Sequence, residues 1–164
     1  DGLESARIEI ITTGLPQFIE GETSVVKDRP YIDYRLTKAI EVGEAVKVSD
    51  ARPTRTNSKS NSLPLLANDG HKWTKWIPEL INGSVWWELD MENFYDVDRV
   101  EITFISSDDL NLSIETSLNK KAWKEVAKGE YLAGSIPQVN FQVSDNSNVR
   151  FLKVNITEKS TKKR

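Results

Sequence analysis

The chain has 164 residues, 38% hydrophobic and 29% charged, so it is long enough for one globular domain with a packed core. Its formal net charge is only -3, and acidic and basic residues are interleaved. This excludes the strong overall positive charge with which a protein attracts nucleic acid or an anionic membrane. It has no cysteine, which excludes disulfides and thiolate metal sites, and no apolar run approaches the ~20 residues that insert across a bilayer.

The first half of the chain carries one clear strand signal. Residues 6–12 alternate apolar and polar side chains and are rich in β-branched residues, which predicts a half-buried strand that ends before Gly14 and Pro16. Residues 18–44 give weaker signals. Residues 45–49 predict a short strand, and the polar run 49–62 predicts a surface loop.

The second half is a series of short alternating segments. Between residues 85 and 91, period two places Trp87, Leu89 and Met91 on one face, which predicts a strand with a core side. The same kind of alternation predicts strands over 97–105, 111–117, 123–126, 138–143 and 150–156. Many short strands without a long helical period indicate an all-β sandwich.

Five short motifs, in this order along the chain, resemble the discoidin or coagulation-factor type C family, whose bacterial branch is carbohydrate-binding module family 32. The motifs are Ala67-Asn68-Asp69-Gly70 with Thr74 and Trp76, Trp86-Trp87-Glu88-Leu89-Asp90, Val100-Glu101-Ile102, Ile114-Glu115-Thr116-Ser117 with Trp123, and Arg150-Phe151-Leu152-Lys153-Val154. The resemblance implies a galactose-binding-like jelly roll of two antiparallel sheets.

The resemblance also implies a domain organisation: an N-terminal segment over 1–44, the sandwich over 45–158 and a basic tail over 159–164. The family usually ends with one more strand, often introduced by Ala-Glu-Ile, after the position of Val154. Residues 4–10 look like that strand, so 6–12 either completes the sandwich or finishes a preceding domain or linker. In the turn before Trp123, Asn119-Lys120 replaces the usual Asp-Gly, and we expect Asn119 to tolerate a positive φ there.

The loop 66–76 is where the resemblance implies a structural calcium. Carried over residue by residue, its ligands would be the Leu66 carbonyl, the Asp69 carboxylate, the carbonyl of His71 and the hydroxyl and carbonyl of Thr74. Further carbonyls would come from near Ser5 or Ala6, since calcium takes 6 to 8 oxygens. The alternative is that Asp69-Gly70 only closes a turn, with Thr74 as its cap.

A sugar ligand would need an exposed aromatic ring against its C–H face and polar groups for its hydroxyls. Trp73 is the best candidate for the ring, because the family motif does not require tryptophan there; the alternative is a lid on the barrel end. By contrast, Trp76, Trp86, Trp87 and Trp123 fall on motif or core-facing positions and are predicted to be packed.

Candidate polar partners for the sugar stand on both sides of Asp69. His71 and Lys75 flank Trp73, while Arg52, Arg55 and Asn57 stand in the preceding loop, whose alternative role is a merely solvated loop. Arginine suits two-pronged recognition of a carboxylate or sulfate, so we expect a glycan partner that is either neutral or acidic.

The chain offers no constellation of acid, base and nucleophile and no glycine-rich phosphate loop, so we expect no enzymatic activity. The resemblance favours a non-catalytic carbohydrate-binding module joined to the catalytic domain of a secreted bacterial polysaccharide-degrading enzyme. It would then lie outside the cell, in the periplasm or on the cell surface. An adhesion or protein-interaction domain and a structural sandwich without ligand are the alternatives.

Overall fold

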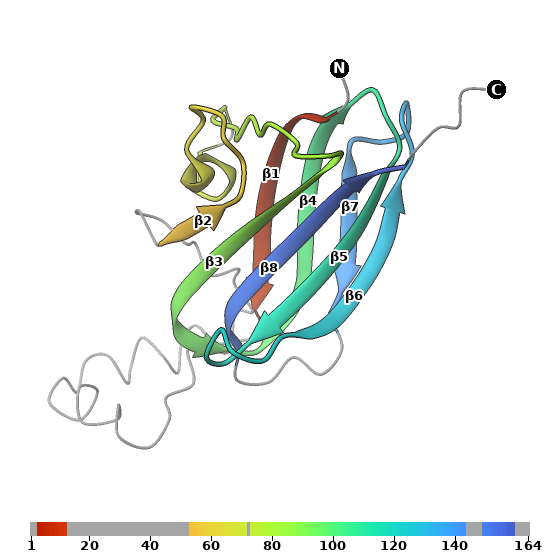
Figure 1. Ribbon diagram of the computed structural model, residues 1–164. Coiled ribbons are helices and arrows are strands. Elements are labelled where there is room, and N and C mark those ends of the chain that lie inside the picture. Colours follow the sequence, from red (N-terminus) through yellow and green to blue (C-terminus); the bar gives the residue numbers. More distant parts are fainter. Residues whose placement is uncertain (1–2, 13–52, 72, 144–148, 160–164) are drawn as a thin grey trace, which may run out of the picture.

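The computed structural model describes residues 3–12, 53–71, 73–143 and 149–159 (Figure 1). The strand predicted over 45–49, Arg52 and the basic tail beyond Lys159 lie outside these residues. Within them, the chain forms two antiparallel sheets that face each other (Figure 1). This confirms the predicted all-β, galactose-binding-like sandwich.

One sheet has three strands in the order β1-β4-β7, and the other has five in the order β2-β3-β8-β5-β6. The strands are β1 (Leu3–Thr12), β2 (Thr54–Thr56), β3 (Ser84–Tyr95), β4 (Val97–Ser106), β5 (Leu110–Ser117), β6 (Lys124–Tyr131), β7 (Gln138–Gln142) and β8 (Val149–Glu158). Among the described residues, one 3-10 turn, η1 (Pro64–Ala67), leads into the loop 66–76 and overlaps its first two residues.

The core lies between the sheets and follows the alternation that the sequence predicts. Trp87, Leu89 and Met91 of β3 are at most 1% exposed, and they pack with the inward-facing residues of β8 and of the three-stranded sheet. Large side chains of this kind each contribute about 1.5–3 kcal/mol on burial, so the inward face of β3 is a major source of stability.

The N-terminal strand is part of this sandwich. β1 pairs antiparallel with β4 over almost its whole length, with Ile8 opposite Ile102, and the side chains of Ala6 and Ile8 are fully buried. The segment predicted as a strand over 6–12 is therefore part of the sandwich and not a linker, because it forms one strand of the three-stranded sheet.

Two local predictions need correction. The run 49–62, predicted as a loop, contains the strand β2, which pairs with β3 so that Arg55 lies opposite Glu88. In the turn before Trp123 the positive φ falls on Lys120, at 65°, and not on Asn119. Asn119 instead uses its side-chain oxygen to accept the backbone N–H groups of Lys121 and Ala122.

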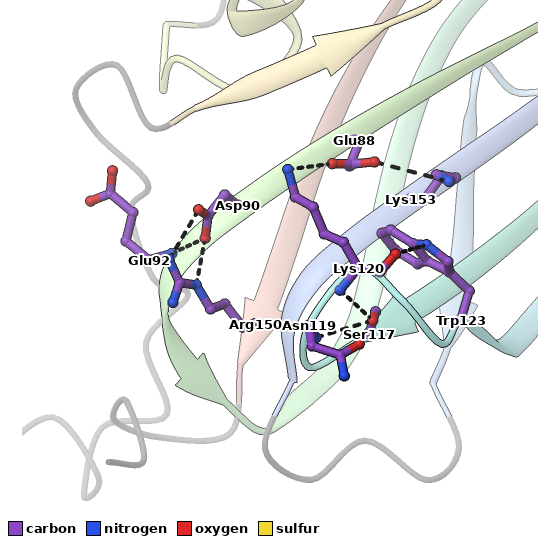
Figure 2. A network of polar contacts seen from close by, with 9 residues as sticks. All are labelled: Glu88, Asp90, Glu92, Ser117, Asn119, Lys120, Trp123, Arg150 and Lys153. Atoms are coloured by element: carbon purple, nitrogen blue, oxygen red, sulfur yellow. Dashed lines mark hydrogen bonds and ion pairs between the residues drawn. The ribbon is translucent and has the colours of Figure 1, made fainter. Parts of the chain in front are cut away.

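From this backbone conformation, the side chain of Lys120 joins an ion-pair network (Figure 2). Glu88 points away from the core, yet its side chain is only 7% exposed; it lies 2.9 Å from the Lys120 ammonium and 3.9 Å from that of Lys153. The Lys120 N–H also donates to the Ser117 hydroxyl at 2.9 Å. A buried carboxylate needs such partners, and Lys120 and Lys153 supply them.

Nearby on the same face, Arg150 and Asp90 form a two-pronged pair of 3.0 and 3.2 Å between β8 and β3 (Figure 2). Partial burial raises the pKa of Asp90, but its hydrogen bonds with Arg150 and with the Glu92 N–H lower it more, so the net shift is downward. The outward face of the five-stranded sheet is thus held by charge pairs across its strands.

Lys120→Ala keeps a side chain in the left-handed conformation but removes the main partner of Glu88, so we predict a loss of about 2 kcal/mol in the free energy of unfolding. Lys120→Gly loses the same partner but relieves the strain, so it should be about 1 kcal/mol more stable than Lys120→Ala. Urea unfolding of both variants measures this difference, with Lys121→Ala as the control. If the alanine and glycine variants were equally stable, the left-handed backbone conformation at position 120 would not be strained.

Candidate functional site

The loop 66–76, which we call the Asp69 loop, is closed by the Asp69 carboxylate. Its Oδ1 accepts the His71 N–H at 2.9 Å and the Thr74 hydroxyl at 2.6 Å. Gly70 lies between them at a φ of 79°, a conformation that glycine adopts without cost. Two donors from within the loop therefore hold one carboxylate oxygen and fix the turn.

The charge of Asp69 is stabilised by the same contacts. Slight burial raises the pKa of its carboxyl, but the hydrogen bonds from Thr74 and His71, and then the charges of His71 and Arg7, lower it by more, so the net pKa is below its usual value. Asp69 is thus a carboxylate, and an acceptor only, at neutral pH.

The Asp69 loop is fastened to the free edge of β1. The Ala6 N–H donates to the Trp76 carbonyl at 2.9 Å, and the Trp76 N–H donates back to the Ala6 carbonyl at 3.2 Å. At the other end of the loop, the Asn68 side chain donates to the Ile8 carbonyl at 2.6 Å. Trp76 itself is fully buried, as the sequence predicted.

Between these two attachments the loop presents its remaining side chains to solvent. Trp73 is 84% exposed, which is the largest exposure among the large hydrophobic side chains of the described residues, and both His71 and Lys75 are also exposed. Trp73 is therefore not a packed lid. An aromatic ring, an imidazole and an ammonium group lie on one short loop that is held at both ends.

Two of the predicted partners upstream of the loop lie on or next to the strand β2. Arg55 is exposed on β2, in the five-stranded sheet. The side-chain oxygen of Asn57 accepts the Trp86 backbone N–H at 2.8 Å, so its amide helps to hold β3. Of the six predicted ligand-binding residues, the structure gathers His71, Trp73 and Lys75 in the Asp69 loop, and Arg52 lies outside the described residues.

Two other tryptophans lie on the outward face of the five-stranded sheet. The Lys153 ammonium is 4.1 Å from the centre of the Trp123 ring and 5.3 Å from that of Trp86. Both rings are half-buried, and the Trp123 ring N–H donates to the Lys120 carbonyl. They are packed, as predicted, but against a cation on the sheet surface rather than in the core.

The oxygens of the Asp69 loop do not fit a calcium cage. Calcium takes 6 to 8 oxygens, whereas the Thr74 hydroxyl is engaged with Asp69 and lies 3.0 Å from the His71 carbonyl, and the Ala6 carbonyl accepts Trp76. Across the described residues, no three histidine, aspartate or glutamate side chains are grouped to hold a metal.

One oxygen near the loop has spare capacity. The side-chain oxygen of Asn68 is buried and accepts no hydrogen bond from the described residues. Counted together with the free oxygen of Asp69 and the carbonyls of Leu66 and Thr74, it gives four oxygens, fewer than the six that calcium takes. The calcium site at Leu66, Asp69, His71 and Thr74 stays a prediction, and the loop holds no preformed cage for it.

The outward face of β8, β5 and β6 carries a hollow of about 510 Å³, which we call the sheet groove. Its polar lining includes Asn111, Ser113, Lys128, Asn155 and Thr157, and the Asn155 amide donates to the Ser113 hydroxyl at 3.1 Å. Sequence reasoning missed the groove, because a row of alternating polar residues on strands is also the pattern of an ordinary solvated face.

The two facing sheets, with one loop closed on an Asp-Gly turn, define a galactose-binding-like sandwich. The F5/8 type C domain model matches residues 47–164, and the chain belongs to this family. No curated protein sequence matches it significantly. Among the described residues no helix is long and apolar enough to cross a membrane.

Solved structures with the same fold are distant in sequence. CpGH89CBM32-6, produced by Clostridium perfringens, is 18% identical with a TM-score of 0.59, over 71% of this chain and 90% of its own. The CBM32 of AlyQ in complex with 4,5-unsaturated mannuronic acid is 16% identical with a TM-score of 0.56, over 68% and 87%. A pectin-binding carbohydrate-binding module is 15% identical with a TM-score of 0.52, over 67% and 81%.

Thr74→Val keeps the shape of the side chain but removes the hydroxyl that holds Asp69. We predict a loss of about 1–2 kcal/mol in the free energy of unfolding, because a hydrogen bond to a charged acceptor is lost. Thr74→Ser, which keeps the hydroxyl, should retain most of the stability. Chemical denaturation of the three proteins is the measurement, and a valine variant as stable as the wild type would show that the turn is held by something else.

Proposed function

We propose that this domain is a non-catalytic carbohydrate-binding module that holds a larger secreted polysaccharide-degrading enzyme, a bacterial glycoside hydrolase, on its glycan. The observation that carries the proposal is the 84% exposure of Trp73 on a loop that is fastened at both ends. An exposed aromatic ring can cover the C–H face of a pyranose, and the fastened loop holds the backbone that carries the ring.

The neighbours of Trp73 define the polar part of this site. His71 can exchange hydrogen bonds with sugar hydroxyls, and the Lys75 ammonium can pair with a uronate carboxylate. Acidic sugars have support from two distant structures, one in complex with 4,5-unsaturated mannuronic acid and one described as pectin-binding. We therefore propose a uronic-acid-containing glycan as the first ligand to test, with neutral glycans beside it.

A module of this kind acts on its neighbour in the chain by proximity. When it binds a polysaccharide, a covalently linked catalytic domain encounters nearby bonds at a high effective concentration, although no new contact is made with that domain. This role requires that the module and its enzyme lie outside the cell, in the periplasm or on the cell surface. Weak binding at the module is sufficient, because the substrate is a repeating polymer.

The test is a glycan array followed by calorimetric titration of the best ligand. Trp73→Ala should weaken binding by roughly 10- to 30-fold, which is typical of an aromatic residue at the centre of a site, without changing the melting temperature. The matched control is Ile136→Ala, which removes an equally exposed apolar side chain from a different loop.

Two further variants locate the site. Lys75→Ala should weaken binding to acidic glycans more than to neutral ones, because it removes only a charge. Lys128→Ala alters the sheet groove and should leave binding unchanged. If Lys128→Ala rather than Trp73→Ala abolishes binding, the ligand lies in the sheet groove, and if no glycan binds, the carbohydrate-binding function is wrong.

A further inference from the structure

We propose that the guanidinium of Arg7 supplies the positive charge at the Asp69 loop, so that the loop closes without calcium. The proposal concerns how the domain is held together and does not depend on which glycan it binds. It runs against the family resemblance, which implies a structural calcium at the same loop.

The backbone places Arg7 at this position. Successive residues of a strand direct their backbone groups to opposite edges, so Ala6 and Ile8 face the same edge of β1 and Arg7 faces β4. Ala6 bonds with Trp76 and Ile8 accepts Asn68, whereas Arg7 is paired with Thr103 of β4. Arg7 thus stands between the two points at which the Asp69 loop is attached.

The side chain of Arg7 is held near the loop and is not directed freely into solvent. Its neighbours Ala6 and Ile8 are fully buried in the core, so alternation turns Arg7 to the outward face of the three-stranded sheet. Only 20% of its side chain is exposed, and it lies 3.8 Å from the carboxylate of Glu9. Such restraint keeps the charge in one place.

The charge of Arg7, which is paired with Glu9, also acts on Asp69. It adds to the lowering of the pKa of the Asp69 carboxyl, after the hydrogen bonds from Thr74 and His71 and the charge of His71. A calcium ion on Asp69 would lie about 2.3–2.6 Å from its oxygens and would be repelled by the guanidinium. Arginine is a permanent cation with a planar group that suits carboxylates, so it can balance Asp69 at any calcium concentration.

The donor set of the loop agrees with this assignment. The Thr74 hydroxyl and the His71 N–H both donate to Oδ1 of Asp69, so these groups are engaged with the carboxylate itself. The Ala6 carbonyl, a further expected ligand, accepts Trp76. The loop is thus closed by two donors on Oδ1 of Asp69, and the fixed cation of Arg7 adds positive charge near it.

The experiment measures melting temperature in a calcium chelator and in millimolar calcium. For the full chain the two values should agree, whereas a calcium site filled about a hundredfold above its dissociation constant would raise the melting temperature by roughly 5 to 10 °C. Such a rise, or one equivalent of calcium in the purified protein by elemental analysis, would overturn the proposal.

Three variants separate the charge of Arg7 from its packing. Arg7→Gln should melt earlier in both buffers, and Arg7→Lys should recover part of the loss because it keeps the charge. Arg7→Glu replaces the cation by a second carboxylate beside Asp69, so calcium should stabilise this variant alone. Glu9→Gln, which changes only the exposed partner, is the control. Unchanged melting of Arg7→Gln would also contradict the proposal.

Glycan binding is read separately, so that the two proposals can fail independently. Loss of glycan binding in Trp73→Ala, with the same melting temperature in chelator and calcium, is the result expected if both hold. A calcium-dependent melting temperature would remove the role of Arg7 and leave that of Trp73 untouched.

Discussion

The free edge of β1 is the constraint on which the rest of the structure depends. Along one edge this strand completes the three-stranded sheet with β4, and along the other it exchanges two backbone hydrogen bonds with Trp76 and accepts one from Asn68. An uncovered strand edge exposes unpaired backbone groups and invites pairing with other chains. The Asp69 loop covers this edge, and the same attachment fixes the position of Trp73.

The residues that hold the Asp69 loop in place alternate along the chain with the residues that it exposes to solvent, but the two sets are different. Asp69 and Thr74 bond to each other within the loop and Trp76 is buried in the core, whereas His71, Trp73 and Lys75 are exposed to solvent. The exposed residues can therefore be substituted without loss of the fold.

Period-two alternation was sufficient to predict β3, β5 and β8, because each has one buried face, and the buried Trp87 followed from the same reasoning. The burial of Trp76 was expected only because it falls on a family motif position. Alternation failed for β2, whose three polar residues form a strand where β3 pairs with them. In the turn before Trp123, intrinsic preference favoured Asn119 for the positive φ, but the side-chain oxygen of Asn119 closes the turn and the positive φ falls on Lys120.

The candidate site was predictable only in part, for a related reason. The exposed Trp73 departs from a family pattern and can therefore be noticed in one sequence. The sheet groove and the charge of Arg7 beside Asp69 arise from residues that are far apart in the chain and are joined by the sheets. Their meaning depends on which strand edges and faces meet, and no local pattern contains that information.

The most direct test of this account is amide hydrogen exchange at Ala6 and Trp76. If the edge of β1 is covered by the Asp69 loop, these two amides exchange only through global unfolding and are as protected as the amides of the β3–β8 ladder. Exchange at the rate of an exposed loop would show that the loop is not fastened to β1. In that case the attachment to β1 could not fix the position of the loop that carries Trp73.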